Sequence, residues 1–132
     1  MTRTPEDLRY TAEHEWVRQT GPTTVRVGIT DYAQSQLGDV VFVQLPDADN
    51  DVTAGQSIAE VESTKSVSDI YAPLNGKVVA VNEDLVQSPE TLNTDPYEAG
   101  WLFELAFEDA AALDSALGEL LDAAGYQGVT GG

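Results

Sequence analysis

The pattern Gly-x-Val-Val-x-Val occurs twice in this chain, and it constrains the fold more than any other feature of the sequence. The two copies are Gly38-Asp-Val-Val-Phe-Val43 and Gly76-Lys-Val-Val-Ala-Val81. In each copy, a glycine suited to a turn precedes a short valine-rich run, which is the composition of a largely buried strand. Two similar halves of short strands predict a flattened β-sandwich with a pseudo-twofold axis.

The segment between the two copies has the pattern of a β-hairpin that presents Lys65. Residues 58–71 contain two runs of strand-forming residues on either side of the polar turn Ser63-Thr64-Lys65-Ser66. The only other lysine, Lys77, follows an Asn-Gly turn and enters a predicted strand. A lysine at a hairpin tip is solvated and accessible. It is therefore either a solubilising surface residue or an amine that is acylated to carry a cofactor between enzymes.

Composition favours one globular domain and excludes several classes of partner. With 132 residues, of which 42% are hydrophobic, the chain can bury a core of its own. Six basic and 23 acidic residues give a net charge of −17, which argues against nucleic acid and anionic membranes as partners. The sequence has no cysteine, no apolar run long enough to span a bilayer and no N-terminal secretory segment. We therefore expect a cytoplasmic protein.

Local patterns in the first part of the chain predict a second hairpin and a short helix. Residues 16–19 and 25–29 alternate as strands and flank a Gly-Pro turn. A helix is expected over residues 32–37, with Asp31 as its N-cap and Gly38 as its end.

The last part of the chain predicts a helix followed by a tail. Apolar residues recur at helical spacing from Leu113 to Ala124, so we expect a C-terminal helical segment within residues 108–125 and a frayed tail from Gly125 onward. We therefore predict a single domain covering residues 1–132, with its β core at about residues 10–107.

Several blocks of the sequence resemble the H-protein family of the glycine cleavage system, a branch of the biotinyl/lipoyl-carrier superfamily. The blocks run in family order over roughly residues 10 to 125. They are His14-Glu-Trp16, Val27-Gly-Ile-Thr-Asp-Tyr-Ala33, Gln36-Leu-Gly-Asp-Val-Val-Phe-Val43, Leu45-Pro46, Val61-Glu-Ser-Thr-Lys-Ser66, Ala72-Pro-Leu-Asn-Gly76, Val81-Asn82, Asp95-Pro-Tyr97 and Gly100-Trp101. Each block alone is weak, but together they are highly specific.

The resemblance implies a carrier protein, not an enzyme, with a mainly β fold of the barrel-sandwich hybrid type, short helices and a C-terminal helix. It implies lipoate joined to Lys65 in an amide, with Glu62 and Ser63 resembling the context recognised by a lipoate-attaching enzyme. The implied partners are glycine decarboxylase (P-protein), which loads an aminomethyl group, aminomethyltransferase (T-protein), which removes it, and dihydrolipoyl dehydrogenase (L-protein), which reoxidises the arm. A carrier that docks in several active sites is expected to be a monomer.

The resemblance also assigns two carboxylates to a pocket for the loaded arm. In this family, a glutamate of the His-Glu-Trp segment and an aspartate four residues past the lysine hold the amine; here these are Glu15 and Asp69. A turn between Thr64 and Lys65 would place Glu60 opposite Asp69, which is unfavourable for two like charges unless the site requires it. Glu13 stands where some relatives have a smaller hydroxyl residue.

Other functions remain open on the residues alone. Lys65 could be a Schiff-base nucleophile, although that role needs a desolvated amine, or the chain could be an interaction module without a cofactor. Biotin is disfavoured because biotinyl domains usually place methionine on both sides of the lysine, and the only methionine here is Met1. His14, the only histidine, lacks the motif context of a triad or zinc site, so we expect a structural or hydrogen-bonding role near Trp16 and no metal.

Overall fold

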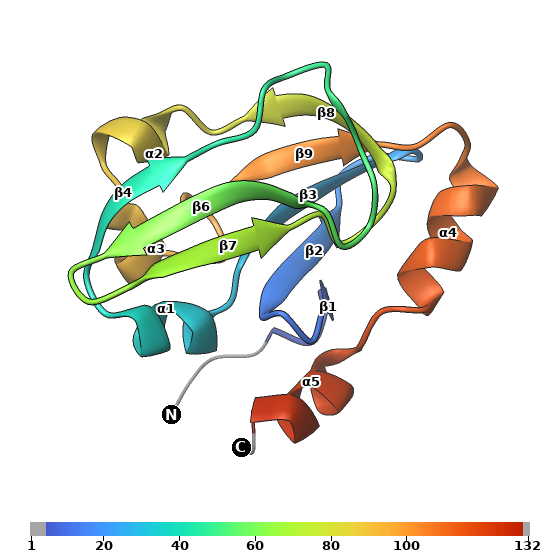
Figure 1. The fold of residues 1–132 in the computed structure, drawn as a ribbon. Helices are drawn as coiled ribbons and strands as arrows, with labels where there is room; N and C mark the ends of the chain where they lie inside the picture. Colours follow the sequence, from blue (N-terminus) through green and yellow to red (C-terminus); the bar gives the residue numbers. More distant parts are fainter. Residues whose placement is uncertain (1–4, 131–132) are drawn as a thin grey trace.

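Two antiparallel β-sheets face each other in the structure, a computed structural model that describes residues 5–130 (Figure 1). The strands are β1 (Arg9–Tyr10), β2 (Glu15–Gln19), β3 (Thr24–Ile29), β4 (Val40–Gln44), β5 (Asp51–Val52), β6 (Ser57–Ser63), β7 (Val67–Tyr71), β8 (Gly76–Val81) and β9 (Phe103–Ala106). The helices are α1 (Asp31–Leu37), α2 (Asp84–Gln87), α3 (Thr91–Thr94), α4 (Ala110–Gly118) and α5 (Ala123–Thr130). One sheet has the order β1-β2-β3-β9-β8-β5 and the other β4-β6-β7, and neither closes into a barrel within the described residues. The predicted β-sandwich is confirmed.

The main core lies between the two sheets. Successive strand residues point to opposite faces, so Val25, Val27 and Ile29 of β3 all point inward and are buried. Val61 of β6 and Ile70 of β7 enter the same cluster from the smaller sheet. Each such side chain contributes roughly 1.5–3 kcal/mol when it is removed from water, so this cluster holds the sheets together.

The two Gly-x-Val-Val-x-Val copies lie in different sheets, in strands β4 and β8. In both strands the pairing register shifts between the third and fifth residues of the pattern, at Val40/Phe42 and at Val78/Ala80. The internal similarity therefore extends from the sequence to the position of a strand irregularity.

Strand β2 buries residues on both of its faces. Val17 belongs to the main core, whereas Trp16 points the opposite way, into a second cluster. The indole lies directly on Gly28, where a Cβ would come within 2.6 Å of the ring. This cluster also contains Leu8, Tyr10, Tyr97, Ala123 and Tyr126. Because Ala123 and Tyr126 belong to α5, the C-terminal helix covers this outer face of the larger sheet.

The N-cap and the first residue of helix α1 each lie one residue earlier than predicted. The N-cap is Thr30, not Asp31: Thr30 is extended, with φ −77° and ψ 165°, and its hydroxyl accepts a hydrogen bond from the Ala33 N–H. Asp31 is the first helical residue, where its negative charge favours the helix N-terminus. The predicted end at Gly38 is confirmed, because Gly38 has φ 83°.

The C-terminal region forms two helices, so the predicted frayed tail is wrong within the described residues. Helix α4 ends at Gly118, and the chain then pairs with β1, where Tyr10 and Leu121 exchange backbone hydrogen bonds of 2.8 and 2.9 Å. Helix α5 follows and continues to Thr130; residues 131–132 of the predicted tail lie outside the described residues. No helix between residues 5 and 130 is long and apolar enough to cross a membrane.

Candidate functional site

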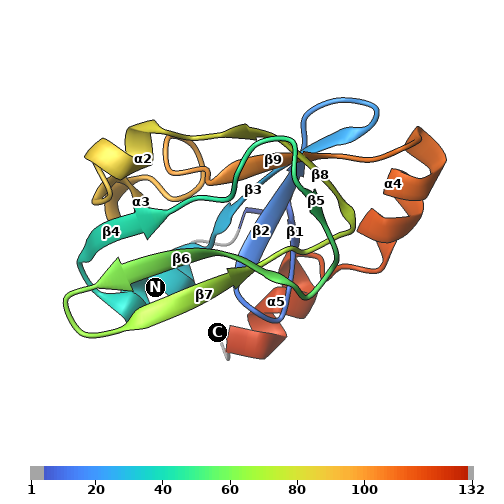
Figure 2. The same ribbon diagram turned by 45° about the horizontal axis from the view of Figure 1, so that its top comes forward.

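Lys65 lies at the tip of the β6–β7 hairpin, as the polar turn predicts. Strand β6 ends at Ser63 and β7 begins at Val67, so Lys65 is in the connecting turn, where it is exposed. It forms no ion pair with any residue that the structure describes. The tip and helix α4 lie at opposite ends of the molecule in both views (Figure 1 and Figure 2). The other lysine, Lys77, is within β8 as expected.

The hydroxyl of Ser63 shapes the turn that presents Lys65. Its Oγ accepts hydrogen bonds from the N–H groups of Lys65 and Ser66 at 3.3 and 3.1 Å, and the Ser63 N–H donates to the Ser66 carbonyl at 2.8 Å. Ser63 is itself buried. A short buried side chain thus fixes the turn internally, while the lysine side chain remains accessible.

The turn is also hydrogen-bonded to the segment that follows α1. The Thr64 N–H donates to the Asp39 carbonyl at 3.1 Å. A Cβ at Gly38 would lie 3.6 Å from Lys65 Cε, so the lysine stem runs alongside this glycine. The base of the lysine side chain therefore starts from a defined position between the hairpin and α1.

The outer face of the smaller sheet combines carboxylates with exposed apolar side chains. Glu60 pairs with Asp69, which confirms the inferred register. Both carboxylates are exposed, so water separates and screens the two like charges. One step nearer the tip, Glu62 stands between Phe42 and Val67, whose side chains are 48% and 56% exposed.

A cleft of about 370 Å³ opens beside the hairpin tip, between α1 and the beginning of β7. Its near end includes Ser66 and Val67, next to Lys65, and its lining also includes Glu13 and His14 of the β1–β2 connection. The cleft thus joins the accessible lysine to the segment that carries the predicted pocket glutamate.

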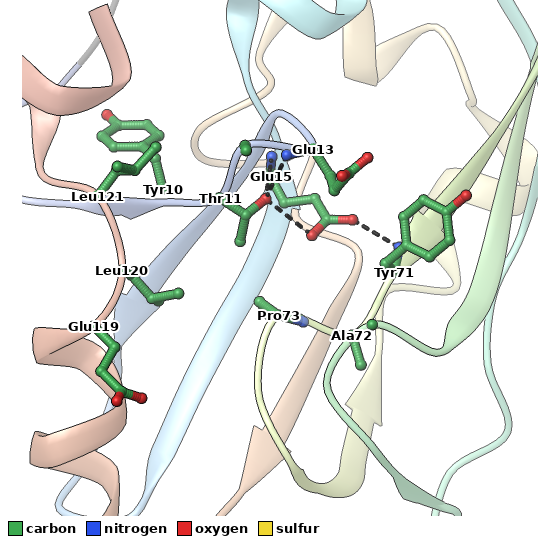
Figure 3. A pocket seen from close by; sticks show the side chains of 12 residues that line it. Tyr10, Thr11, Glu13, Glu15, Tyr71, Ala72, Pro73, Glu119, Leu120 and Leu121 are labelled. Atoms are coloured by element: carbon green, nitrogen blue, oxygen red, sulfur yellow. Dashed lines mark hydrogen bonds between the residues drawn. The ribbon is translucent and has the colours of Figure 1, made fainter. Parts of the chain in front are cut away.

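Glu15 is buried where β2 meets the end of β7. Its Oε2 accepts a hydrogen bond of 2.7 Å from the Tyr71 N–H, and its Oε1 accepts one of 3.2 Å from the Thr11 hydroxyl (Figure 3). Burial is the largest influence on the carboxyl and raises its pKa to about 7, against the lowering effect of these hydrogen bonds. Glu15 also lines a cavity of about 520 Å³ between the β1–β2 connection and the segment before α5. A carboxyl of this kind can bind an amine or exchange a proton near neutral pH.

Asp69 has a different environment. It is exposed on β7 and lines neither of these two cavities. Glu15 bonds to the backbone two residues further along the same strand, at Tyr71. The structure therefore brings Glu15 to the strand that carries Asp69, but only Glu15 is enclosed.

Three residues near Glu15 were not predicted as functional from the sequence. The Thr11 hydroxyl and the Tyr71 backbone N–H donate to the carboxylate, and the hydroxyl of Tyr126 in α5 bonds to His14. His14 has the expected hydrogen-bonding role, although its partner is this tyrosine. No motif indicates these contacts, because each depends on segments distant in sequence. Within residues 5–130, no group of three or more His, Cys, Asp or Glu side chains is arranged to hold a metal ion.

Comparison with known proteins gives one consistent result. The family model described as "Glycine cleavage H-protein" matches residues 8–129. The chain is 79% identical to the glycine cleavage system H protein of Nocardia farcinica over 132 residues, the whole of both chains. It is 66% identical to that of Mycolicibacterium smegmatis, with 98% of each covered. The crystal structure of a glycine cleavage system H protein from Mycobacterium marinum superposes with a TM-score of 0.84 at 48% identity, covering 96% of this chain and 98% of the other.

Proposed function

Because the chain belongs to the glycine cleavage H-protein family, we propose that Lys65 is the residue that carries lipoate, through an amide on its Nζ. The chain is accordingly a carrier component of the glycine cleavage system and not a catalyst, and its mainly β architecture is the barrel-sandwich hybrid that the resemblance implies. The observation that carries the assignment is an exposed lysine on a turn fixed by its own hydrogen bonds.

The surroundings of Lys65 suit acylation. An amide removes the ammonium charge, and this costs the fold little because Lys65 is exposed and pairs with none of the described acids. When attached, lipoate supplies a dithiolane that accepts the aminomethyl group derived from glycine. The defined position of Gly38 and Thr64 beside the lysine stem gives the tether a fixed origin, which raises the effective concentration of its end at each docked enzyme.

The outer face of the smaller sheet is the proposed docking surface for the three partner enzymes, glycine decarboxylase, aminomethyltransferase and dihydrolipoyl dehydrogenase. Phe42 and Val67 offer apolar contact area next to the tip, and Glu60, Glu62 and Asp69 surround them with negative charge. A partner with a basic rim around an apolar patch complements this surface. The net charge of −17 would also steer such a partner toward the carrier.

Glu62 and Ser63 are proposed to direct the lipoate-attaching enzyme in different ways. Glu62 is exposed and can contact that enzyme directly. Ser63 is buried and accepts hydrogen bonds from the Lys65 and Ser66 N–H groups, so its contribution is the shape of the turn.

The cytoplasmic location, the monomeric state and the single domain remain predictions from the sequence.

The loaded arm is proposed to run through the cleft beside α1 and past Glu13, which lines both this cleft and the cavity that contains Glu15, so that its amine reaches the Glu15 carboxylate. An amine on carbon next to sulfur is lost when water reaches it, so enclosure and a charge-assisted hydrogen bond would prolong its lifetime. The buried carboxylate of Glu15 can accept that bond, and the ammonium would in turn favour its ionised form. Asp69 is exposed and lines neither cavity, so in this proposal it is not an enclosed ligand of the amine.

Two other functions fit the site less well. A Schiff-base lysine needs a desolvated amine, and Lys65 is exposed. An interaction module without a cofactor would explain the apolar and acidic sheet face, but it gives no reason for an exposed lysine on a hydrogen-bonded turn at the tip of that face.

Reconstituted glycine cleavage with matched lysine variants tests the proposal. After incubation with the lipoate-attaching enzyme, Lys65→Arg should give no glycine-dependent formation of the one-carbon product, because arginine cannot form the amide. Lys77→Arg, which changes the exposed lysine of β8, should retain the wild-type rate. Activity of the Lys65→Arg protein would contradict the proposal.

A further inference from the structure

Tyr126 of α5 is fully buried and joins the C-terminal helix to the segment before β2. Its hydroxyl lies 2.8 Å from His14 Nδ1 and 2.6 Å from Thr30 Oγ1. Its ring stacks on Tyr10, with centroids 4.7 Å apart and planes 12° apart. One side chain thus contacts the two segments that lead into β2 and α1.

His14 has a backbone conformation that needs support. Its φ of 68° lies in the left-handed region, which is unfavourable for a residue other than glycine. The conformation is held by two backbone hydrogen bonds of 3.1 Å, from the His14 N–H to Thr11 and from the Thr30 N–H to His14. Such strain persists only where the surroundings fix it, and it concentrates at functional positions.

The residues on either side of His14 point into the two cavities. Glu13 lines the cleft beside α1, and it also reaches the cavity that contains Glu15. The orientation of both glutamates follows from the turn at His14, here called the 11–15 turn (residues 11–15). His14 is itself held between Tyr126 and the ring of Tyr32, whose centroid is 4.9 Å away.

We propose that Tyr126 is a positioning residue for the loaded arm: through His14 and Thr30, its hydroxyl fixes the 11–15 turn so that the Glu15 carboxylate faces the end of β7. This inference rests on the proposed role of Glu15. It assigns the C-terminal helix a part in the site, although α5 contributes no residue to the cleft beside the hairpin.

The hydrogen-bond chain has a consistent arrangement. Burial lowers the pKa of His14 in spite of nearby Glu13, which favours a neutral ring. Burial also raises the pKa of Tyr126 to about 12, so its hydroxyl remains a donor. With Nδ1 unprotonated, Tyr126 donates to His14 and accepts from Thr30; with Nδ1 protonated, His14 donates to Tyr126, which donates to Thr30. In both tautomers, Thr30 accepts from the Ala33 N–H at 3.1 Å. Removing one hydroxyl breaks the chain in its middle.

Tyr126→Phe tests the inference because it removes the hydroxyl and keeps the stacked ring. In the unloaded, full-length protein, NMR titration of the Glu15 carboxyl should show its midpoint moved toward ordinary values by about half a unit or more, since a loosened turn admits water. The amide signals of residues 11–15 should shift as well. In the loaded protein, spontaneous loss of the aminomethyl group should be about 3- to 10-fold faster.

Two comparisons make the outcome decisive. Leu113→Ala in α4 removes a buried side chain of the main core and destabilises the fold away from the turn; it should leave both the Glu15 midpoint and the lifetime of the aminomethyl group unchanged. Glu15→Gln measures the role of Glu15 itself and should shorten that lifetime. Glu13 and Glu119, the other acids of the Glu15 cavity, are unchanged in all three variants.

The proposed role of Glu15 and the positioning role of Tyr126 fail in distinguishable ways. If Glu15→Gln leaves the lifetime unchanged, the role of Glu15 is wrong, and the Glu15 midpoint alone then decides whether Tyr126 positions the turn. If Glu15→Gln shortens the lifetime but Tyr126→Phe changes neither the midpoint nor the lifetime, or changes only one of them, the inference about Tyr126 is overturned.

Discussion

A single buried carboxyl, that of Glu15, connects the two sheets next to the proposed arm site. It belongs to β2 of the larger sheet and accepts its shorter hydrogen bond from Tyr71, at the end of β7 in the smaller sheet. Its burial raises its pKa to about 7. A cationic amine beside this carboxyl lowers the cost of its ionisation, so binding of the amine is linked to loss of the carboxyl proton.

The same residue should make the stability of the fold depend on pH in a defined direction. The folded carboxyl keeps its proton up to about pH 7, whereas the unfolded one loses it near 4.5. Between these values the folded state binds more protons, so the free energy of unfolding falls as pH rises. Relative to that of Glu15→Gln, the free energy of unfolding of the wild type should fall by roughly 3 kcal/mol between these two pH values, measured by denaturant unfolding. Parallel curves of unfolding free energy against pH for wild type and Glu15→Gln would contradict the burial argument.

At the residue scale, the sequence predicts which residues have a role better than it predicts how their backbone and side chains are placed. Thr30 and Asp31 are both good N-cap residues, and the extended backbone of Thr30 decides between them only in the folded chain. The resemblance identifies Glu15, but its enclosure and the exposure of Asp69 follow from tertiary packing. Ser63 could be identified as a context residue, whereas its hydrogen bonds to the turn could not.

At the scale of elements, local turn signals predicted the hairpins, whereas tertiary contacts determine the secondary structure of the C-terminal region. The polar turn at Lys65 fixes the pairing of β6 with β7, and the sequence contained that information. Residues from Gly125 onward have weak helix propensity because of their glycines. Helix α5 nevertheless forms, since buried Tyr126 packs on Tyr10 and gains stability that propensity does not provide. A pattern confined to nearby residues cannot reveal such an anchor.

The outer face of the smaller sheet should behave as a docking element. Val67→Ser next to the tip should lower kcat/KM of glycine decarboxylase for the lipoylated carrier by about 5-fold or more, because apolar contact area at the interface is lost. Val79→Ser on β8, which is 44% exposed in the larger sheet, is the matched control and should have no such effect. Equal effects of the two substitutions would mean that the sheet face has no special role.

At the scale of the whole molecule, the sandwich separates a rigid scaffold from one accessible amine. The main core between the sheets fixes β6 and β7, and their turn projects at the end opposite α4 (Figure 1). The repeated Gly-x-Val-Val-x-Val pattern supports this arrangement from both sheets, with the same irregularity in β4 and β8. This global architecture was predictable because it depends on repeated local patterns, whereas the cleft and the cavity depend on how the connections pack.

The most direct test of the account is the intact mass of the protein purified from its native host, with peptide mapping of the modified residue. We expect the mass to exceed that of the unmodified protein by one lipoyl group, located on Lys65 and absent from Lys65→Arg. Native protein that supports glycine cleavage with an unmodified Lys65, or with the lipoyl group on Lys77, would contradict the account.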